Sequence, residues 1–350
     1  MIRAPSDRVV RLGLALLAFA LWSTFAAVHA HVKPADYYVF WEAARHWQAP
    51  YDPALITALE ARLHITGAWP FVYPPTFLLV AWPFAQLPLA LAYPLWTGVS
   101  AALFTYAAAH LVKPPWATLA LFIVPPVVLA ISPGQTSLIV GAALIGGWLN
   151  LERRPALAGV LFAVAACVKP QAAVLAPLLM FGHWRVLRWA IIGGLGMVIA
   201  SCVFGPAVWL EWAQAMTVYR PEIFDRVNPS ALAPSPYLQV GLIILGLWFA
   251  WTWRDLGGLL IGTFCATPYA HQYDLAALAP IALSWIIDHR RLGWGRAICG
   301  AGFLAGFVST PAGGLVFVLG LAVAAVLERR RMTSPPPLLS QAEAGSDALG

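Results

Sequence analysis

The chain has 350 residues, of which 61% are hydrophobic and only 10% are charged. A water-soluble domain carries roughly a quarter charged residues, so this composition excludes an ordinary soluble protein. The formal net charge of +6 does not indicate a nucleic-acid-binding protein either. Its arginines form small clusters between apolar runs, as in the cytoplasmic loops of membrane proteins, and make no basic stripe.

Apolar runs recur from residue 9 to residue 328, and most are long enough to be membrane spans or halves of spans. This pattern predicts an all-α polytopic membrane protein, with residues 1–331 forming one bundle of about 12 transmembrane helices. Several runs are shorter than the ~20 residues that a straight span needs. The 29 prolines and 28 glycines are consistent with broken or partial spans, since neighbouring helices can satisfy the backbone groups that proline frees.

The first apolar run allows two interpretations. Arg3, Arg8 and Arg11 precede it, and it ends at Ala30 in a passable signal-peptidase site. Its length and the presence of Trp22 favour a retained membrane anchor. With either interpretation, the segment that follows lies on the outer side of the membrane.

Arginine placement predicts the side that each loop faces, because cytoplasmic loops carry more positive charge. Both termini are predicted to be cytoplasmic, in a multi-pass protein of the plasma (inner) membrane. The polar residues 332–350 are predicted to form a disordered cytoplasmic tail. The outer segments are then 29–72, 132–137, 169–171, 206–235 (a second long outer loop), 267–274 and 309–313.

Residues 73–113 do not fit this topology simply. They contain two apolar runs, but an odd number of crossings is needed to bring Lys113 inside. Either one run does not cross, or Lys113 is outside and a later span is miscounted. The sequence leaves both alternatives open.

The first outer loop is predicted to contain two interfacial helices, over residues 36–47 and 53–64. Asp36, Glu42, Arg45 and His46 would form the polar face of the first helix. Asp36 and Asp52 each stand where an N-cap is expected. Capping alone therefore makes the two acids equivalent, and a catalytic role for Asp36 needs other support.

Further polar residues are predicted at the same outer face: Gln135, Lys169, Tyr269, His271, Tyr273 and Asp274. Three of them have an ordinary structural explanation as well: a turn for Gln135, a snorkelling side chain for Lys169 and a helix cap for Asp274. Together they suit a lipid-linked phosphate substrate. Lysine neutralises a phosphate, aromatic rings stack on a sugar or lipid, and a carboxylate accepts a proton from an attacking hydroxyl.

The chain lacks the sequence motifs of several other kinds of catalytic or binding site. There is no DxD or DD pair, so a metal-held nucleotide sugar is not expected. The chain also lacks a P-loop and a GxSxG elbow, and its four cysteines have no metal-binding or CxxC spacing and are predicted to be buried. No metal and no cofactor are expected.

The ordered motifs of the chain resemble glycosyltransferase family 87, a family of the GT-C class of membrane glycosyltransferases. The resemblance covers most of residues 9–290. Its motifs are Asp36-Tyr37, Pro50-Tyr51, Phe71-Val72-Tyr73-Pro74-Pro75, Pro133-Gly134-Gln135, Ala158-Gly159, Lys169-Pro170, Thr267-Pro268-Tyr269, His271 and Tyr273-Asp274.

The resemblance implies a GT-C helical bundle that takes a hexose from a polyprenyl-phosphate donor on the outer, periplasmic face of the membrane. The acceptor would be a lipid or a glycan, and membrane lipids would surround the bundle. Asp36 would be the general base of an inverting, metal-independent transfer. The donor's phosphate and sugar would be bound by Tyr73, Gln135, Lys169, Tyr269, His271, Tyr273 and Asp274.

One departure concerns the late motif, where related sequences often have Ser-Pro and adjacent histidines. This chain has Thr267-Pro268 and a single histidine, His271. The role of His271 is therefore open, and so is the identity of the hexose, for which the resemblance suggests mannose. Two other functions remain in competition: a transporter or flippase of a lipid-linked or small polar solute, and a non-catalytic membrane subunit.

Overall fold

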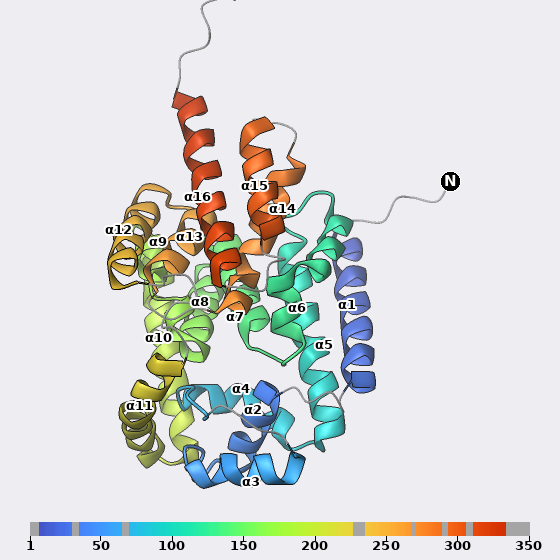
Figure 1. Ribbon diagram of the computed structural model, residues 1–350, viewed down its shortest axis with the longest axis vertical. Coiled ribbons are helices and arrows are strands. Elements are labelled where there is room, and N and C mark those ends of the chain that lie inside the picture. The colour runs from blue at the N-terminus through green and yellow to red at the C-terminus, as the bar shows by residue number, and fades with distance from the viewer. Residues whose placement is uncertain are drawn as a thin grey trace, which may run out of the picture.

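The computed structural model describes residues 7–29, 35–64, 70–226, 235–267, 271–288, 293–305 and 311–333. Across these ranges every regular element is a helix (Figure 1). The first half contains α1 (Asp7–His29), α2 (Ala35–Arg45), α3 (Pro53–Leu63), α4 (Thr76–Ala85), α5 (Leu89–Ala108), η1 (Pro115–Ile123), α6 (Pro125–Ile131), α7 (Ser137–Asn150) and α8 (Pro155–Val168). The second half contains η2 (Pro170–Ala172), α9 (Ala176–Met180), α10 (Trp184–Ser201), η3 (Cys202–Phe204), α11 (Ala207–Arg226), α12 (Pro236–Thr252), α13 (Leu256–Ala266), η4 (Gln272–Leu278), α14 (Ala279–Ile287), α15 (Gly293–Ala305) and α16 (Pro311–Thr333).

Fewer helices are long enough to cross a membrane than the sequence predicts. Within the described ranges, three segments combine sufficient length with apolar composition: α1, α5 and α10 continued through η3. Six shorter apolar helices accompany them. The apolar runs divide at prolines such as Pro125, which opens α6, and Pro170, which follows the end of α8. The all-helical class is confirmed, and the bundle of about twelve spans is not.

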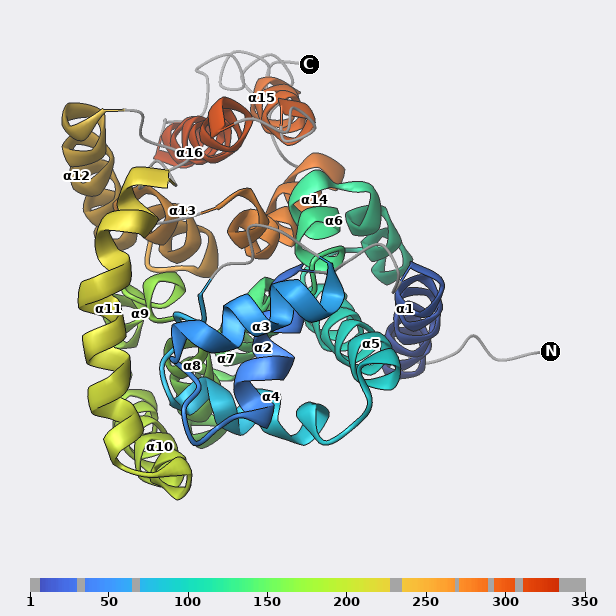
Figure 2. The same cartoon turned by 60° about the horizontal axis from the view of Figure 1, so that its bottom comes forward.

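The segment predicted to be the first outer loop contains two helices, α2 and α3, close to their predicted positions. Figure 2 shows α3 lying over α2 at the end of the molecule where α4 also lies. The predicted polar face of α2 was wrong in one respect, because Glu42 is only 3% exposed. Its carboxylate accepts a 2.6 Å bond from Arg62 of α3 and lies 3.4 Å from the His46 ring. Glu42 thus joins the two helices.

The structure also bears on the topology of residues 73–113. The first run forms α4, whose ten residues extend about 15 Å and do not cross a hydrocarbon core ~30 Å thick. The second run forms α5, whose 20 residues make it a candidate span. This supports the alternative in which the first run does not cross.

Helix α1 packs along α5 (Figure 1). Ser23 donates a 3.0 Å hydrogen bond to the carbonyl of Pro94, and the absence of a side chain at Gly98 lets the backbone of Phe19 approach closely. These contacts hold α1 against α5.

Two other predicted segments are described in part. Residues 207–226, in the predicted second outer loop, form the single helix α11. The predicted disordered tail, residues 332–350, lies outside the described residues from 334 onward. Of the four cysteines predicted to be buried, Cys265 and Cys299 are buried, Cys167 is partly buried, and Cys202 is exposed.

We predict that Gly159→Ala will destabilise the contact between α8 and α10. A Cβ at Gly159 would lie 2.5 Å from the carbonyl oxygen of Val186 and 2.6 Å from the nitrogen of Ala190. Because both are backbone atoms, the helices must separate, at a cost on the order of 1–3 kcal/mol. Thermal unfolding in detergent should show a lower Tm.

The matched control is Gly196→Ala, on α10 itself, where a Cβ meets nothing within 4 Å. Alanine is the better helix former, so this variant should keep or raise the Tm. Equal Tm values for the two variants would contradict the close contact.

Candidate active site

The turn between α6 and α7 holds the end of α2 that carries Asp36. The N–H of Tyr37 donates to the carbonyl of Pro133 at 2.9 Å. Gly134, the next residue of the turn, has a φ of +72°, and a Cβ there would lie 2.7 Å from the Cβ of Tyr37. Glycine at this position therefore permits both the left-handed backbone and the close approach of α2.

Two aromatic side chains of α5 fix the same turn. The Tyr93 hydroxyl donates to the carbonyl of Ser132 at 2.8 Å. The Trp96 indole donates to the carbonyl of Gly134, also at 2.8 Å. The turn is thus packed between α2 and α5, and this packing sets the position of the next residue, Gln135.

Asp36 is half-buried and accepts a side-chain hydrogen bond from Gln135. Burial raises the pKa of the Asp36 carboxyl above its ordinary value, while the bond from Gln135 and the positive charge of Lys169 act in the opposite direction. A carboxylate with a raised pKa is a stronger base than an exposed one, which suits it to accept a proton from a hydroxyl.

Asp36 and Asp52, the two acids compared in the sequence analysis, have different structural roles. Asp36 lies inside α2, in its first turn, so the prediction that it is an N-cap was wrong. Asp52 is the N-cap of α3, and its carboxylate accepts a 2.9 Å bond from the N–H of Ala54. Capping therefore accounts for Asp52 and not for Asp36.

Tyr73 connects the extended segment before α4 to this site. Its hydroxyl donates to Oε1 of Gln135 at 3.3 Å and lies 3.2 Å from the hydroxyl of Thr136. The amide group of Gln135 consequently accepts from Tyr73 with its oxygen and donates to Asp36 with its nitrogen. The ring of Phe40, one turn after Asp36 on α2, packs edge-to-face on the Tyr73 ring.

A buried ion pair forms the second part of the site. Lys169, directly after α8, donates to the carboxylate of Asp274 in η4, and the two residues are 3% and 5% exposed. The same carboxylate accepts bonds from the hydroxyl of Ser137 at 2.8 Å and from the N–H of His271 at 3.0 Å. Nζ of Lys169 lies 4.8 Å from the centre of the Tyr273 ring.

The late motif forms the start of η4. His271 is the N-cap residue, and its side chain accepts from the backbone N–H of Asp274 while Asp274 accepts from that of His271. The rings of His271 and Tyr273 stack at 4.9 Å. Asp274 is thus not the N-cap itself but the third residue of η4, and it takes part both in the capping box and in the ion pair. Tyr269, the remaining predicted site residue, lies outside the described residues.

Sequence reasoning did not assign Ser137 or Thr136 to the site, although both follow Gln135 directly. Each is less than 4% exposed and bonds to a site residue. The signal in the sequence was a pair of hydroxyl side chains directly before an apolar run, where a helix was expected to start. The described residues contain no group of three or more His, Cys, Asp and Glu side chains arranged to hold a metal ion.

The fold is that of a helical membrane protein. Its candidate site combines a half-buried acid, Asp36, with the buried ion pair of Lys169 and Asp274. The sequence model of glycosyltransferase family 87, the family that the motifs of the chain resemble, matches residues 71–235. No curated protein and no solved structure matches the chain. The matched range contains Tyr73, Gln135 and Lys169, whereas Asp36 and Asp274 come from outside it.

We predict that Lys169 and Asp274 are energetically coupled. Removing one partner of a buried ion pair costs roughly 3–5 kcal/mol, because the other charge stays buried without compensation. Lys169→Met and Asp274→Asn should therefore each lower the Tm strongly. The double variant leaves no unpaired charge and should lose less than the sum of the single losses.

A thermal-unfolding double-mutant cycle in detergent measures this coupling. Lys113→Met, at an exposed lysine, is the control and should leave the Tm nearly unchanged. Strict additivity of the two single effects would contradict the coupling.

Proposed function

We propose that the protein is a membrane glycosyltransferase that moves a hexose, mannose in the first instance, from a polyprenyl-phosphate donor to a lipid or glycan acceptor. One observation carries the proposal: two residues within the range matched by the family 87 model, Gln135 and Lys169, act on Asp36, which lies before that range. Gln135 bonds to the Asp36 carboxylate, and Lys169 lies close enough for its charge to act on it. A base and a cation that acts on it through its charge are thus both present in this region, as transfer from a sugar phosphate requires.

Asp36 is the proposed general base. Its carboxylate accepts the proton of an acceptor hydroxyl while the hydroxyl oxygen forms a bond to the anomeric carbon of the donor sugar. The bond from that carbon to the phosphate oxygen breaks, and polyprenyl phosphate leaves with the electron pair. Attack opposite the leaving group inverts the anomeric configuration. Gln135 and Tyr73 orient the carboxylate by their hydrogen bonds.

Lys169 is proposed to stabilise the phosphate of the donor. An ammonium group has three N–H donors, and Asp274 accepts from it, so the group retains donors for a phosphate oxygen. Asp274 fixes the direction of the side chain, while His271, Tyr273 and Tyr269 complete the proposed donor site. Burial strengthens the attraction between ammonium and phosphate, because charges interact more strongly in a low-dielectric environment.

The site is proposed to face the outside of the plasma (inner) membrane, with both termini cytoplasmic. The arginine distribution supports this orientation. The grouping of α2, α3 and α4 at one end of the molecule (Figures 1 and 2) is consistent with it. A transporter or a non-catalytic subunit would not need an ionisable Asp36, so the variants below separate the three functions.

We predict that Asp36→Asn will abolish transfer without unfolding the protein. Asparagine keeps the size of the side chain and removes the proton acceptor, and loss of a general base costs about 100- to 10,000-fold in rate. The measurement is transfer of radiolabelled sugar from polyprenyl-phosphate donors in proteoliposomes, with Tm recorded for the same preparations.

Asp52→Asn is the matched control, since asparagine caps a helix about as well as aspartate. Its kcat at saturating acceptor should stay within a few-fold of the wild-type value, because Asp52 is not part of the proposed proton transfer. Equal losses in both variants, or more than about a tenth of the rate remaining in Asp36→Asn, would show that Asp36 is not the base.

We also predict that the acid limb of kcat/KM reports Asp36. The base works only when deprotonated, so activity falls as the pH drops through its pKa, and burial places that fall above the usual range for aspartate, ~3.9. Gln135→Leu removes a bond that favours the charged form, so its acid limb should move to higher pH. Gln86→Leu, at an exposed glutamine, should leave the limb in place. A limb that does not respond to Gln135→Leu would belong to another group.

A further inference from the structure

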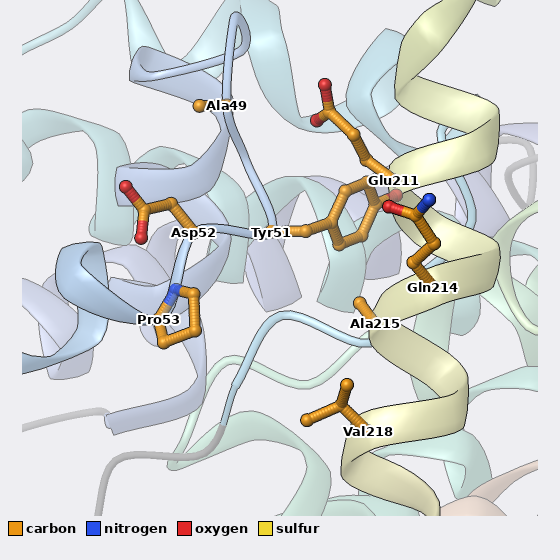
Figure 3. Close-up of a pocket in the computed structure, with 8 residues that line it drawn as sticks. All are labelled: Ala49, Tyr51, Asp52, Pro53, Glu211, Gln214, Ala215 and Val218. Atoms are coloured by element: carbon orange, nitrogen blue, oxygen red, sulfur yellow. The ribbon is translucent and has the colours of Figure 1, made fainter.

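A cleft of about 320 Å³ lies between the start of α3 and the middle of α11, outside the site described above. This volume is within the range of small-ligand sites, which are mostly apolar with a few placed polar groups. Figure 3 shows Glu211 and Gln214 extending from α11 beside the Tyr51 ring. The lining residues are Ala49, Tyr51, Asp52, Pro53, Glu211, Gln214, Ala215 and Val218.

Both walls of the cleft are tied to the segment that carries Tyr73. On one side, the Tyr51 hydroxyl donates to the carbonyl of Tyr73 at 2.7 Å. On the other side, the Trp212 indole of α11 donates to the carbonyl of Val72 at 3.2 Å. Since the side chain of Tyr73 bonds to Gln135, only Tyr73 and Gln135 separate Tyr51 from Asp36 in this series of contacts.

The polar groups of the cleft select against an anion. Asp52 and Glu211 are carboxylates, and none of the eight lining residues is a lysine or an arginine. Glu211 lies near the Tyr51 hydroxyl, whose pKa is raised by burial and further by the charge of Glu211. Carboxylates accept hydrogen bonds from hydroxyl groups, and an amide both accepts and donates them, while the carboxylates would repel a phosphate. The cleft therefore differs in chemistry from the Lys169 side of the site.

We propose that this cleft binds a neutral saccharide portion of the acceptor, next to the portion whose hydroxyl Asp36 deprotonates. Glu211 and Gln214 hydrogen-bond to its hydroxyl groups, and the apolar side chains of Ala215 and Val218 pack against its C–H faces. The inference rests on the proposed glycosyl transfer, and it gives that reaction an acceptor subsite on α11. It also assigns the phosphate-bearing substrate to the part of the site that contains Lys169.

The first test measures occupancy of the cleft without requiring activity. Val218→Cys is made in a background in which Cys167, Cys202, Cys265 and Cys299 are serine, because Cys202 is exposed. In nanodiscs, its alkylation by a maleimide is followed with octyl mannoside, octyl glucoside or octyl phosphate present. The three probes share one alkyl chain and differ in the head group.

A neutral glycoside should slow the alkylation about tenfold when present at roughly ten times its Kd, and octyl phosphate should not. Thr217→Cys, exposed on α11 outside the cleft, should react at the same rate with and without each probe. Equal protection by octyl phosphate, or no protection by either glycoside, would overturn the proposal.

The second test uses the glycosides as acceptors in the transfer assay. Glu211→Ala should raise the acceptor KM about tenfold, as expected for loss of a hydrogen bond to a charged group. Its kcat and the donor KM should stay near the wild-type values, and Glu211→Gln, which keeps a hydrogen-bond acceptor, should recover most of the affinity. Thr217→Ala is the control and should match the wild type.

The outcomes distinguish this inference from the function on which it rests. Normal transfer with an unchanged acceptor KM in Glu211→Ala would overturn the acceptor subsite and leave the glycosyltransferase proposal standing. Absence of transfer from every polyprenyl-phosphate donor, with protection of Val218→Cys by glycosides, would overturn the proposed reaction and retain a saccharide-binding cleft.

Discussion

The buried ion pair between Lys169 and Asp274 is the interaction on which the arrangement of the site depends. It joins the end of α8 to η4, and the Ser137 hydroxyl brings the start of α7 to the same carboxylate. Transfer of two charges from water is costly, and their attraction compensates only when the remaining polar atoms are also bonded. The backbone N–H of His271 supplies one such bond. Three segments far apart in the sequence are therefore held together at one point, beside Asp36.

The charges of this region also set the chemistry that Asp36 can perform. Asp274 compensates the charge of Lys169 through a direct bond, whereas Asp36 receives only the longer-range effect of that charge and a bond from Gln135. A lysine bonded directly to Asp36 would make its carboxylate a weaker base. Asp274 thus has a structural role in the ion pair, whereas Asp36 is available for proton transfer, although the charge of Lys169 acts on both.

The sequence predicted the helical class and the two helices between α1 and α4, because these follow from local composition and periodicity. Arginine placement and motif order led to the prediction that Gln135, Lys169 and Asp274 lie near one another. The sequence did not predict how many helices are long enough to span, since prolines divide the apolar runs at positions that hydropathy alone does not reveal. It also placed Glu42 on a polar face, although the carboxylate is buried against Arg62. The pairing of Lys169 with Asp274 and the cleft beside α11 arise from tertiary packing, which periodicity does not report.

The ion pair has a consequence for biosynthesis as well. Its two members are 105 residues apart in the chain, so a ribosome completes α8 long before it reaches η4. During that interval the nascent chain carries Lys169 at the end of an apolar helix without its carboxylate partner, a costly state within a bilayer. The segment carrying Lys169 then has to stay near water, lipid phosphates or an insertion factor until residue 274 has been made. Assembly of this protein in the membrane consequently has an order, and its final polar contacts form only late in synthesis.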